Sequence, residues 1–267
     1  YLFFLDSDDY FNDDLILCCI QAIKSILNIT KKDLFEMKIL IYGLNYYPEL
    51  TGVGKYTGEM SEYLALRGHD VRVITSSPHY PDWKVSNEYK AYRYYFEKIN
   101  NVEVWRAPLW LPHNINGLKR LICLSSFSVS SFPLLLTTLF WRPQIVIVIA
   151  PSLLYAAQAL LVSKLSGSKS WIHVQDFEVD AAFGLGILPK GLLYSIALRV
   201  ERWLFSHFDQ ASSISKGMTT LLVNKGVSPS KVVHFPNWID VNEIFPIYDK
   251  SSINFYRKQL SIKNNVV

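Results

Sequence analysis

The residues best suited to hold a charged ligand are Gly52, Val53, Gly54 and Lys55, which follow a short apolar run and precede an amphipathic stretch. The two glycines carry no side chains, so they leave the neighbouring peptide N–H groups open to a ligand. A helix that begins at such a loop adds the positive end of its dipole, and the combination suits a phosphate group. A tight turn that binds nothing has the same pattern and is the alternative.

Acidic side chains form a second candidate site near the start of the chain. Asp6 and Asp8 follow an apolar run at 1–5 that is typical of a buried strand. Closely spaced carboxylates suit a hard divalent cation such as Mg²⁺ or Mn²⁺. The alternative is a solvated acidic turn that caps a helix beginning near Asp13.

A third group lies where a predicted strand at 171–174 ends, with His173 inside the strand and Asp176 just beyond it. Ligands of open α/β sheets bind at the carboxyl ends of the strands, so both side chains are candidates for contact with a reacting centre. A histidine within a strand is also commonly a core residue, which remains the alternative for His173.

Two loops carry further candidates for substrate contact. His79 and Tyr80 lie in the proline-punctuated segment 76–83, and His113 follows the prolines that end a predicted strand at 102–110. Such loops often line binding sites, although exposed loop histidines without a ligand are also common.

These candidates need a scaffold, and the chain supplies one by alternating strands and helices. Strands are expected at 37–42, 71–75, 102–110, 144–150, 171–174 and 232–235, and helices from Lys55 and at 152–166 and 192–205. This alternation predicts an α/β fold with a Rossmann-like parallel sheet. The run at 144–150 is apolar on both faces, so it belongs at the centre of that sheet.

Composition and charge narrow the classes of function. The chain of 267 residues is 50% hydrophobic and 19% charged, as in a packed globular protein, and its three cysteines show no metal spacing and suit a reduced cytosol. Residues 1–36 hold three Lys and seven Asp or Glu, whereas residues 37–267 hold 24 basic and 16 acidic residues. This diffuse basic excess favours phosphate-bearing ligands or an anionic membrane surface over nucleic acid.

The apolar run at 121–140 is long enough for a membrane span, which needs roughly 20 residues. Its serines, Pro133 and the flanking Lys119, Arg120 and Arg142 favour instead a buried or membrane-surface helix. We therefore expect a cytoplasmic protein that lies peripherally on the inner face of the cytoplasmic membrane.

Several motifs, taken in order, resemble one known family. The segment MKILIYGLNYYPELTGVGKYTGEM at 37–60, and later SKGM, KGV, KVVHFPN and WID, are similar to the N-terminal domain of family 4 (group 1) glycosyltransferases of the GT-B fold, and most of all to colanic acid biosynthesis transferases. The resemblance covers 37–246. Residues 247–267 look like the start of a second, C-terminal domain, and 1–36 form a short α/β segment in which Asp6-Ser7-Asp8 resembles the DXD motif of family 2 glycosyltransferases.

The resemblance implies transfer of a sugar, with retention of configuration, from a nucleotide-sugar donor to a polyprenyl-diphosphate-linked saccharide in exopolysaccharide biosynthesis. No cofactor is then required by the main domain, and Mg²⁺ or Mn²⁺ concerns only Asp6 and Asp8. The loop at 52–55 would approach the donor phosphates, and His173 and Asp176 the reacting sugar. His79, Tyr80 and His113 would be acceptor-binding candidates.

Two alternatives remain. The family's donor-binding domain should begin where this sequence stops, so the chain is expected to be an incomplete transferase, inactive alone, or else a non-catalytic acceptor-binding or membrane-surface module. A nicotinamide-binding Rossmann protein is a remoter possibility, because Gly43, Gly52 and Gly54 lack the spacing of a dinucleotide fingerprint.

Overall fold

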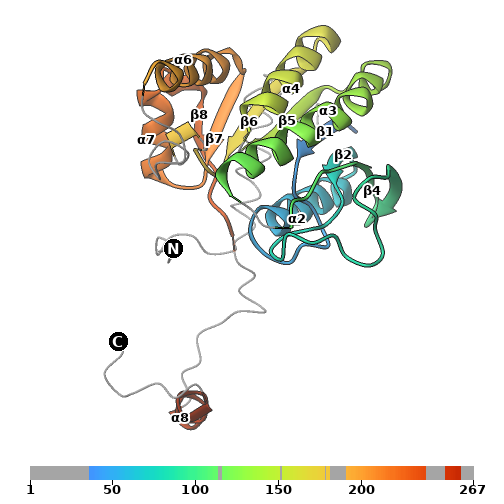
Figure 1. Ribbon diagram of the computed structural model, residues 1–267, viewed down its shortest axis with the longest axis vertical. Coiled ribbons are helices and arrows are strands. Elements are labelled where there is room, and N and C mark those ends of the chain that lie inside the picture. Colours follow the sequence, from blue (N-terminus) through green and yellow to red (C-terminus); the bar gives the residue numbers. More distant parts are fainter. Residues whose placement is uncertain are drawn as a thin grey trace.

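The structure, a computed structural model, describes residues 36–113, 116–150, 152–177, 179–180, 191–238 and 250–259 (Figure 1). Strands and helices alternate along most of it. The elements are β1 (Lys38–Gly43), α2 (Gly52–Leu66), β2 (Asp70–Ser76), β3 (Tyr95–Ile99), β4 (Val102–Ala107), α3 (Gly117–Trp141), β5 (Ile145–Ala150), α4 (Leu153–Ser166), β6 (Lys169–Val174), α6 (Leu192–His207), β7 (Gln210–Ser213), α7 (Lys216–Asn224), the 3₁₀ turn η1 (Pro229–Lys231), β8 (Val232–His234) and α8 (Lys250–Gln259).

The strands form one 8-stranded sheet in the order β3-β4-β2-β1-β5-β6-β7-β8. Every neighbouring pair is parallel except β3 and β4. The predicted α/β fold with a Rossmann-like parallel sheet is confirmed, and β5, buried at every position, lies near its centre. The antiparallel edge strand β3 was not predicted, because Glu97 and Lys98 interrupt its apolar residues and none of its positions is fully buried.

The sheet reverses its strand order between β1 and β5. From β1 the chain proceeds through β2 to β4 on one side, and from β5 through β6 and β7 to β8 on the other. The connections after β1 and β5 therefore leave in opposite directions at the carboxyl ends of adjacent strands. In open α/β sheets this switch point is where ligands bind.

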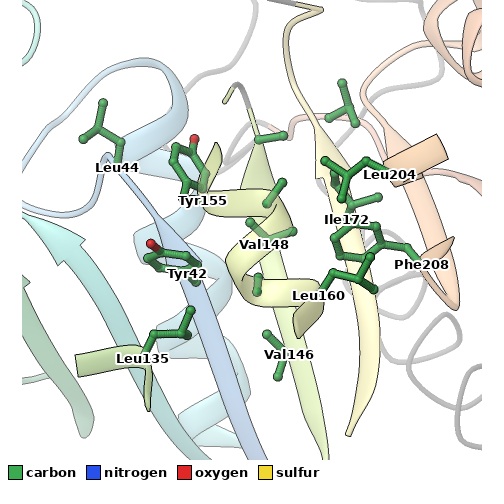
Figure 2. Packing of buried hydrophobic residues seen from close by; sticks show 14 of the residues in the cluster. Tyr42, Leu44, Leu135, Val146, Val148, Tyr155, Leu160, Ile172, Leu204 and Phe208 are labelled. Carbon is green, nitrogen blue, oxygen red and sulfur yellow. The ribbon is translucent and has the colours of Figure 1, made fainter. Parts of the chain in front are cut away.

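Two apolar clusters cover the two faces of the sheet. The larger joins alternate strand residues to α3, α4, α6 and α7, and Figure 2 shows Tyr42 and Val148 from the sheet beneath Leu135 of α3 and Tyr155 of α4. The smaller joins the opposite strand residues to α2 and to Phe235 and Trp238. The sheet is thus the middle layer of three.

Helix α3 contains the apolar run at 121–140. By its length of 25 residues and its composition, this helix could cross a membrane. However, 44% of its most apolar window is buried inside the protein. Asn116 caps its start by accepting a hydrogen bond from the Lys119 N–H at 2.9 Å. The buried side of α3 packs on the sheet through Leu124, Phe127 and Leu135.

Helix α2 begins at Gly52 rather than Lys55, so the two glycines form its first turn and do not belong to the preceding loop. The proposed segment 1–36, with Asp6 and Asp8, lies outside the described residues apart from Glu36, as do 239–249 and 260–267.

Candidate functional site

The candidate site lies at the carboxyl edge of the sheet, where the loops after β1, β2, β4 and β6 gather. These loops contain the other described candidate residues, whereas Gly52, Val53, Gly54 and Lys55 form the first turn of α2 and His173 lies within β6. The start of α2 and the start of α3 reach the same edge, because each helix follows a strand that ends there.

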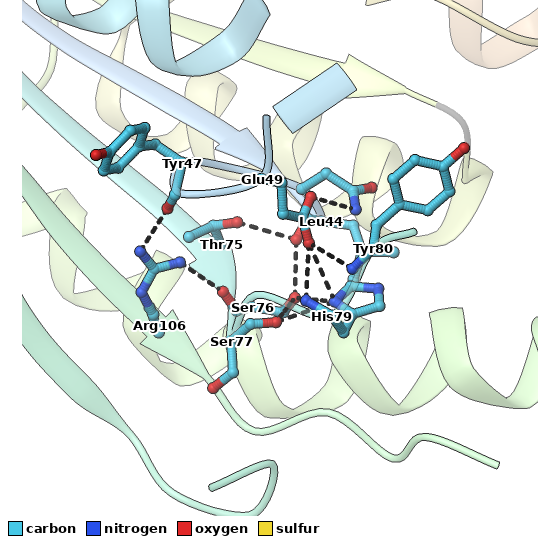
Figure 3. A network of polar contacts seen from close by, with 10 residues as sticks. Leu44, Tyr47, Glu49, Thr75, Ser76, Ser77, His79, Tyr80 and Arg106 are labelled. Atoms are coloured by element: carbon cyan, nitrogen blue, oxygen red, sulfur yellow. Dashed lines mark hydrogen bonds and ion pairs between the residues drawn. The ribbon is translucent and has the colours of Figure 1, made fainter. Parts of the chain in front are cut away.

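A buried carboxylate holds two of these loops together (Figure 3). Glu49, only 4% exposed, accepts hydrogen bonds at Oε1 from the backbone N–H groups of His79 at 2.9 Å and Tyr80 at 3.0 Å. Its Oε2 accepts a third from the Asn45 amide at 2.8 Å. The β1–α2 loop and the β2–β3 loop are therefore fixed relative to each other by one side chain.

The start of α2 is shaped by the same carboxylate. A Cβ added to Gly54 would lie 2.7 Å from both Cβ and Oε2 of Glu49, closer than real atoms approach, and Gly52 has a φ of +60°. The first turn of α2 contains no acidic residue, and the Thr51 side chain makes no capping hydrogen bond with it. Packing against Glu49 thus requires glycine at position 54, and the positive φ favours glycine at position 52. The first-turn N–H groups retain their positive character.

Arg106 of β4 links two strands to this arrangement. Its guanidinium is fully buried and donates to the carbonyl oxygens of Ser76 at 2.9 Å and Tyr47 at 2.7 Å. It also pairs with Glu97 of β3. Arg106 therefore ties the edge strand β3, through a partly buried ion pair, to the end of β2 and to the β1–α2 loop.

His79 and Tyr80, two of the acceptor-binding candidates, differ in their surroundings. The His79 ring is buried, with Nδ1 lying 3.0 Å from the Ser77 carbonyl oxygen, and burial lowers its pKa despite the opposing effect of nearby Glu49. Tyr80 is 42% exposed and packs its ring against Trp83. Tyr80 is thus open to a ligand, whereas His79 supports the loop from within.

His113 contributes to a groove of about 700 Å³ beyond the carboxyl end of β4. Its walls are mostly apolar and aromatic and come from the β2–β3 loop, the β4–α3 loop and the first half of α3. The residues that line it include Trp83, Lys84, Tyr92, Trp110, His113, Ser126 and Ser130. Aromatic rings with a few polar groups at the rim suit the faces of sugar rings or an apolar chain.

His173 lies inside the sheet. Its Nδ1 is 2.9 Å from Ser212 Oγ on β7, its ring packs on Phe235, and it is 4% exposed. Burial lowers its pKa to about 3, so the ring is neutral at physiological pH. In this arrangement His173 joins β6 to β7 and lies one residue before the end of β6.

Asp176 is exposed just beyond β6, at the edge itself. Partial desolvation raises the pKa of its carboxyl group, against the opposing effect of the Arg120 cation at the start of α3. The Asp176 carboxylate and the Arg120 cation therefore interact electrostatically at the edge of the site.

Metal ligation has no candidate in the part of the chain that the structure describes. No group of three or more His, Cys, Asp or Glu side chains there is placed to hold an ion. The Asp6 and Asp8 prediction lies outside the described residues and stays a prediction.

Sequence reasoning missed Glu49, Arg106 and Arg120. Two of them carried a signal: Arg106 is a charge within a mostly buried strand, and Glu49 is an acid in an otherwise uncharged loop beside glycines. Charges in such positions are retained only when paired. Arg120 had no such signal, because basic residues at helix starts are commonly solvated.

Comparison with known proteins agrees with this architecture. The chain has a TM-score of 0.57 with sucrose-phosphate synthase from Thermosynechococcus elongatus, at 13% identity over 86% of this chain and 54% of that one. It has a TM-score of 0.51 with Anabaena Alr3699/HepE in complex with UDP and glucose, at 14% identity over 86% and 52%. The fold is thus that of one half of a GT-B glycosyltransferase.

Sequence similarity identifies the family. Residues 51–238 match the Glycosyl transferase 4-like domain, which is more than half of the chain. The chain belongs to this family, as the resemblance had suggested. It is also 44% identical over 232 residues to the putative colanic acid biosynthesis glycosyl transferase WcaI of Escherichia coli K12, which covers 86% of this chain and 56% of that protein. The chain spans about half the length of the relatives it matches.

Proposed function

We propose that this chain is the acceptor-side half of a retaining glycosyltransferase, which moves a sugar from a nucleotide-sugar donor to a polyprenyl-diphosphate-linked saccharide in exopolysaccharide assembly. The observation that carries the proposal is the gathering, at the carboxyl edge of a GT-B domain, of an exposed carboxylate, a glycine-started helix and an aromatic groove. Family membership and the WcaI relative support the same reaction class.

In this reaction an acceptor hydroxyl oxygen bonds to the anomeric carbon, and the bond from that carbon to the nucleoside diphosphate breaks. The leaving diphosphate keeps the electron pair of the broken bond, and the hydroxyl proton is released to solvent. Negative charge then develops on the leaving diphosphate. The N–H groups at Val53, Gly54 and Lys55 would stabilise that charge from the start of α2. Asp176 would accept a hydrogen bond from a sugar hydroxyl, and the partial desolvation that raises its pKa would strengthen that hydrogen bond.

The remaining candidates take supporting roles in the proposal. Tyr80, Trp110 and His113 would contact the saccharide acceptor. His173 would act as a positioning residue that fixes the end of β6 through Ser212. Most donor affinity would come from a second domain, and the lipid of the acceptor would bring the enzyme to the inner face of the cytoplasmic membrane.

A transfer assay tests the proposal. The chain is incubated with a nucleotide sugar and a polyprenyl-diphosphate saccharide, with and without the relative's C-terminal domain fused after it, and release of the nucleoside diphosphate is measured. We expect turnover only in the fused protein, and a loss of about a hundredfold in kcat for Asp176→Asn.

Glu36→Gln is the matched control, since Glu36 is an exposed acid before β1, at the opposite edge of the sheet. Equal losses in the two variants would refute the role of Asp176. Acceptor binding without transfer by the fused protein would instead favour a non-catalytic binding module, and turnover by the chain alone would exclude that module.

A further inference from the structure

The outer sides of three neighbouring helices carry apolar residues where a globular protein normally carries polar ones. Helix α4 lies between α3 and α6 and contacts both. The exposed apolar residues of this surface, named here the three-helix face, are Leu118, Ile122, Val129, Leu136 and Phe140 of α3, Leu154, Leu161 and Leu165 of α4, and Leu192, Ile196, Val200 and Trp203 of α6.

The spacing shows that these residues form continuous stripes. On α3 the intervals between successive members are four, seven, seven and four residues, which return to the same side of a helix each time. The stripe is strongly exposed, with Phe140 at 91% and Val129 at 73%. The opposite side of α3 is already occupied by the core, so the outer stripe adds nothing to the packing of this domain.

The exposed charges within α3, α4 and α6 have one sign, and the half-buried Asp209 just after α6 lies near Lys164. Helices α3 and α4 contain no Asp or Glu, and the single acid of α6, Glu201, is buried in an ion pair with Lys225. Exposed cations on the same helices or at their ends include Arg142, Lys164 and Arg199. An apolar surface whose exposed charges are positive is complementary to anionic lipid, which attracts cations and accepts apolar side chains between its headgroups.

We infer that the three-helix face rests on an anionic lipid bilayer, with the outer stripes of α3, α4 and α6 inserted at the boundary between headgroups and acyl chains. This inference rests on the proposed function and assigns its membrane contact to the three-helix face. A second copy of the chain is disfavoured as the occupant, since pairing two such faces would bring their cations together. Helix α3 lies on the bilayer rather than crossing it, because its inner side is part of the core.

Vesicle sedimentation of the 267-residue chain tests the inference without any need for sugar transfer, so its failure is separate from failure of the proposed reaction. We expect binding to vesicles of phosphatidylcholine with phosphatidylglycerol, and little to phosphatidylcholine alone. Phe140→Asp should weaken binding about tenfold or more, since it removes a large apolar group from the boundary. Lys164→Gln and Arg199→Gln should each weaken vesicle binding about fivefold at low salt, and this difference from the parent chain should disappear at high salt.

Leu66→Asp is the matched control, because Leu66 is 69% exposed at the end of α2, on the opposite face of the sheet. Thermal unfolding confirms that each variant is folded. Equal binding by Phe140→Asp and the parent chain would overturn the inference, as would equal binding to neutral and anionic vesicles or no binding to either. A dimer in solution that Phe140→Asp dissociates would assign the face to a second copy instead.

Discussion

Replacing Glu49 tests whether one buried carboxylate holds the site loops in place. In Glu49→Ala the backbone N–H groups of His79 and Tyr80 lose their acceptor at 2.9 and 3.0 Å, the first in a buried position and the second in a partly buried one. Each unsatisfied buried donor costs about 1–3 kcal/mol, so the pair gives about 2–6 kcal/mol. Glu49→Gln keeps an acceptor of the same shape at that position, and we expect it to cost about 1 kcal/mol.

Urea unfolding followed by tryptophan fluorescence measures the free energy of unfolding, and amide hydrogen exchange locates the change. In Glu49→Ala the amides of His79 and Tyr80 should exchange far faster than in the parent chain, beyond the general effect of lower stability. The amides of β5, at the centre of the sheet, should follow the global stability alone.

Glu88→Ala is the control, since Glu88 is an exposed acid in the same β2–β3 loop, and exposed substitutions usually change stability by about 0.5 kcal/mol or less. The reasoning is refuted if Glu49→Ala and Glu49→Gln cost the same amount. It is also refuted if the His79 and Tyr80 amides stay protected in Glu49→Ala, because their hydrogen bonds would then not depend on this carboxylate.

Three further predictions follow from the same structure. Gly54→Ala should lose about 1–3 kcal/mol in urea unfolding, because the new Cβ would lie 2.7 Å from Glu49, whereas Gly217→Ala, with its nearest neighbour at 4.0 Å, should lose nothing. The His173 pKa is lowered from 6.5 to about 3 in the folded chain, so below pH 6.5 the unfolded chain binds more protons than the folded one. The free energy of unfolding therefore decreases as the pH is lowered. His173 alone should remove about 2 kcal/mol between pH 7 and pH 5, a share that His173→Gln abolishes; an unchanged pH profile would contradict this. Lys225→Met should cost about 3–5 kcal/mol by leaving the Glu201 charge buried without its partner, and adding Glu201→Gln should restore most of it if the charge is the cause.

The central strands were predictable because their signals are local. The run at 144–150 is apolar on both faces, and the structure buries β5 at every position. The helix predicted at 152–166 corresponds to α4, which ends at Gly167 with a φ of +72°. Edge strand β3 gave no such signal, since it owes its place to pairing with β4 and to the ion pair between Glu97 and Arg106.

The site was less accessible to sequence reasoning, because its organising contacts are long-range. Glu49 and His79 are 30 positions apart, and no pattern within either loop indicates that they meet. The alternation of strand residues did carry information about His173. Trp171 and His173 share one face of β6, and both bond to Ser212 of β7 inside the sheet, whereas Asp176 follows the end of the strand and reaches the edge.

Helix α3 connects the two proposals physically. Ser126 and Ser130 line the aromatic groove at the carboxyl edge, while Ile122 and Val129, on the outer side of the same helix, belong to the three-helix face. A lipid-linked saccharide must keep its polyprenyl chain in the bilayer while its sugar reaches the edge of the sheet. If the face rests on the membrane, the groove lies less than a helix diameter, about 10 Å, from the lipid boundary. The proposed acceptor could then enter the groove without leaving the bilayer, and the membrane contact would account for the apolar outer side of a helix whose inner side belongs to the core.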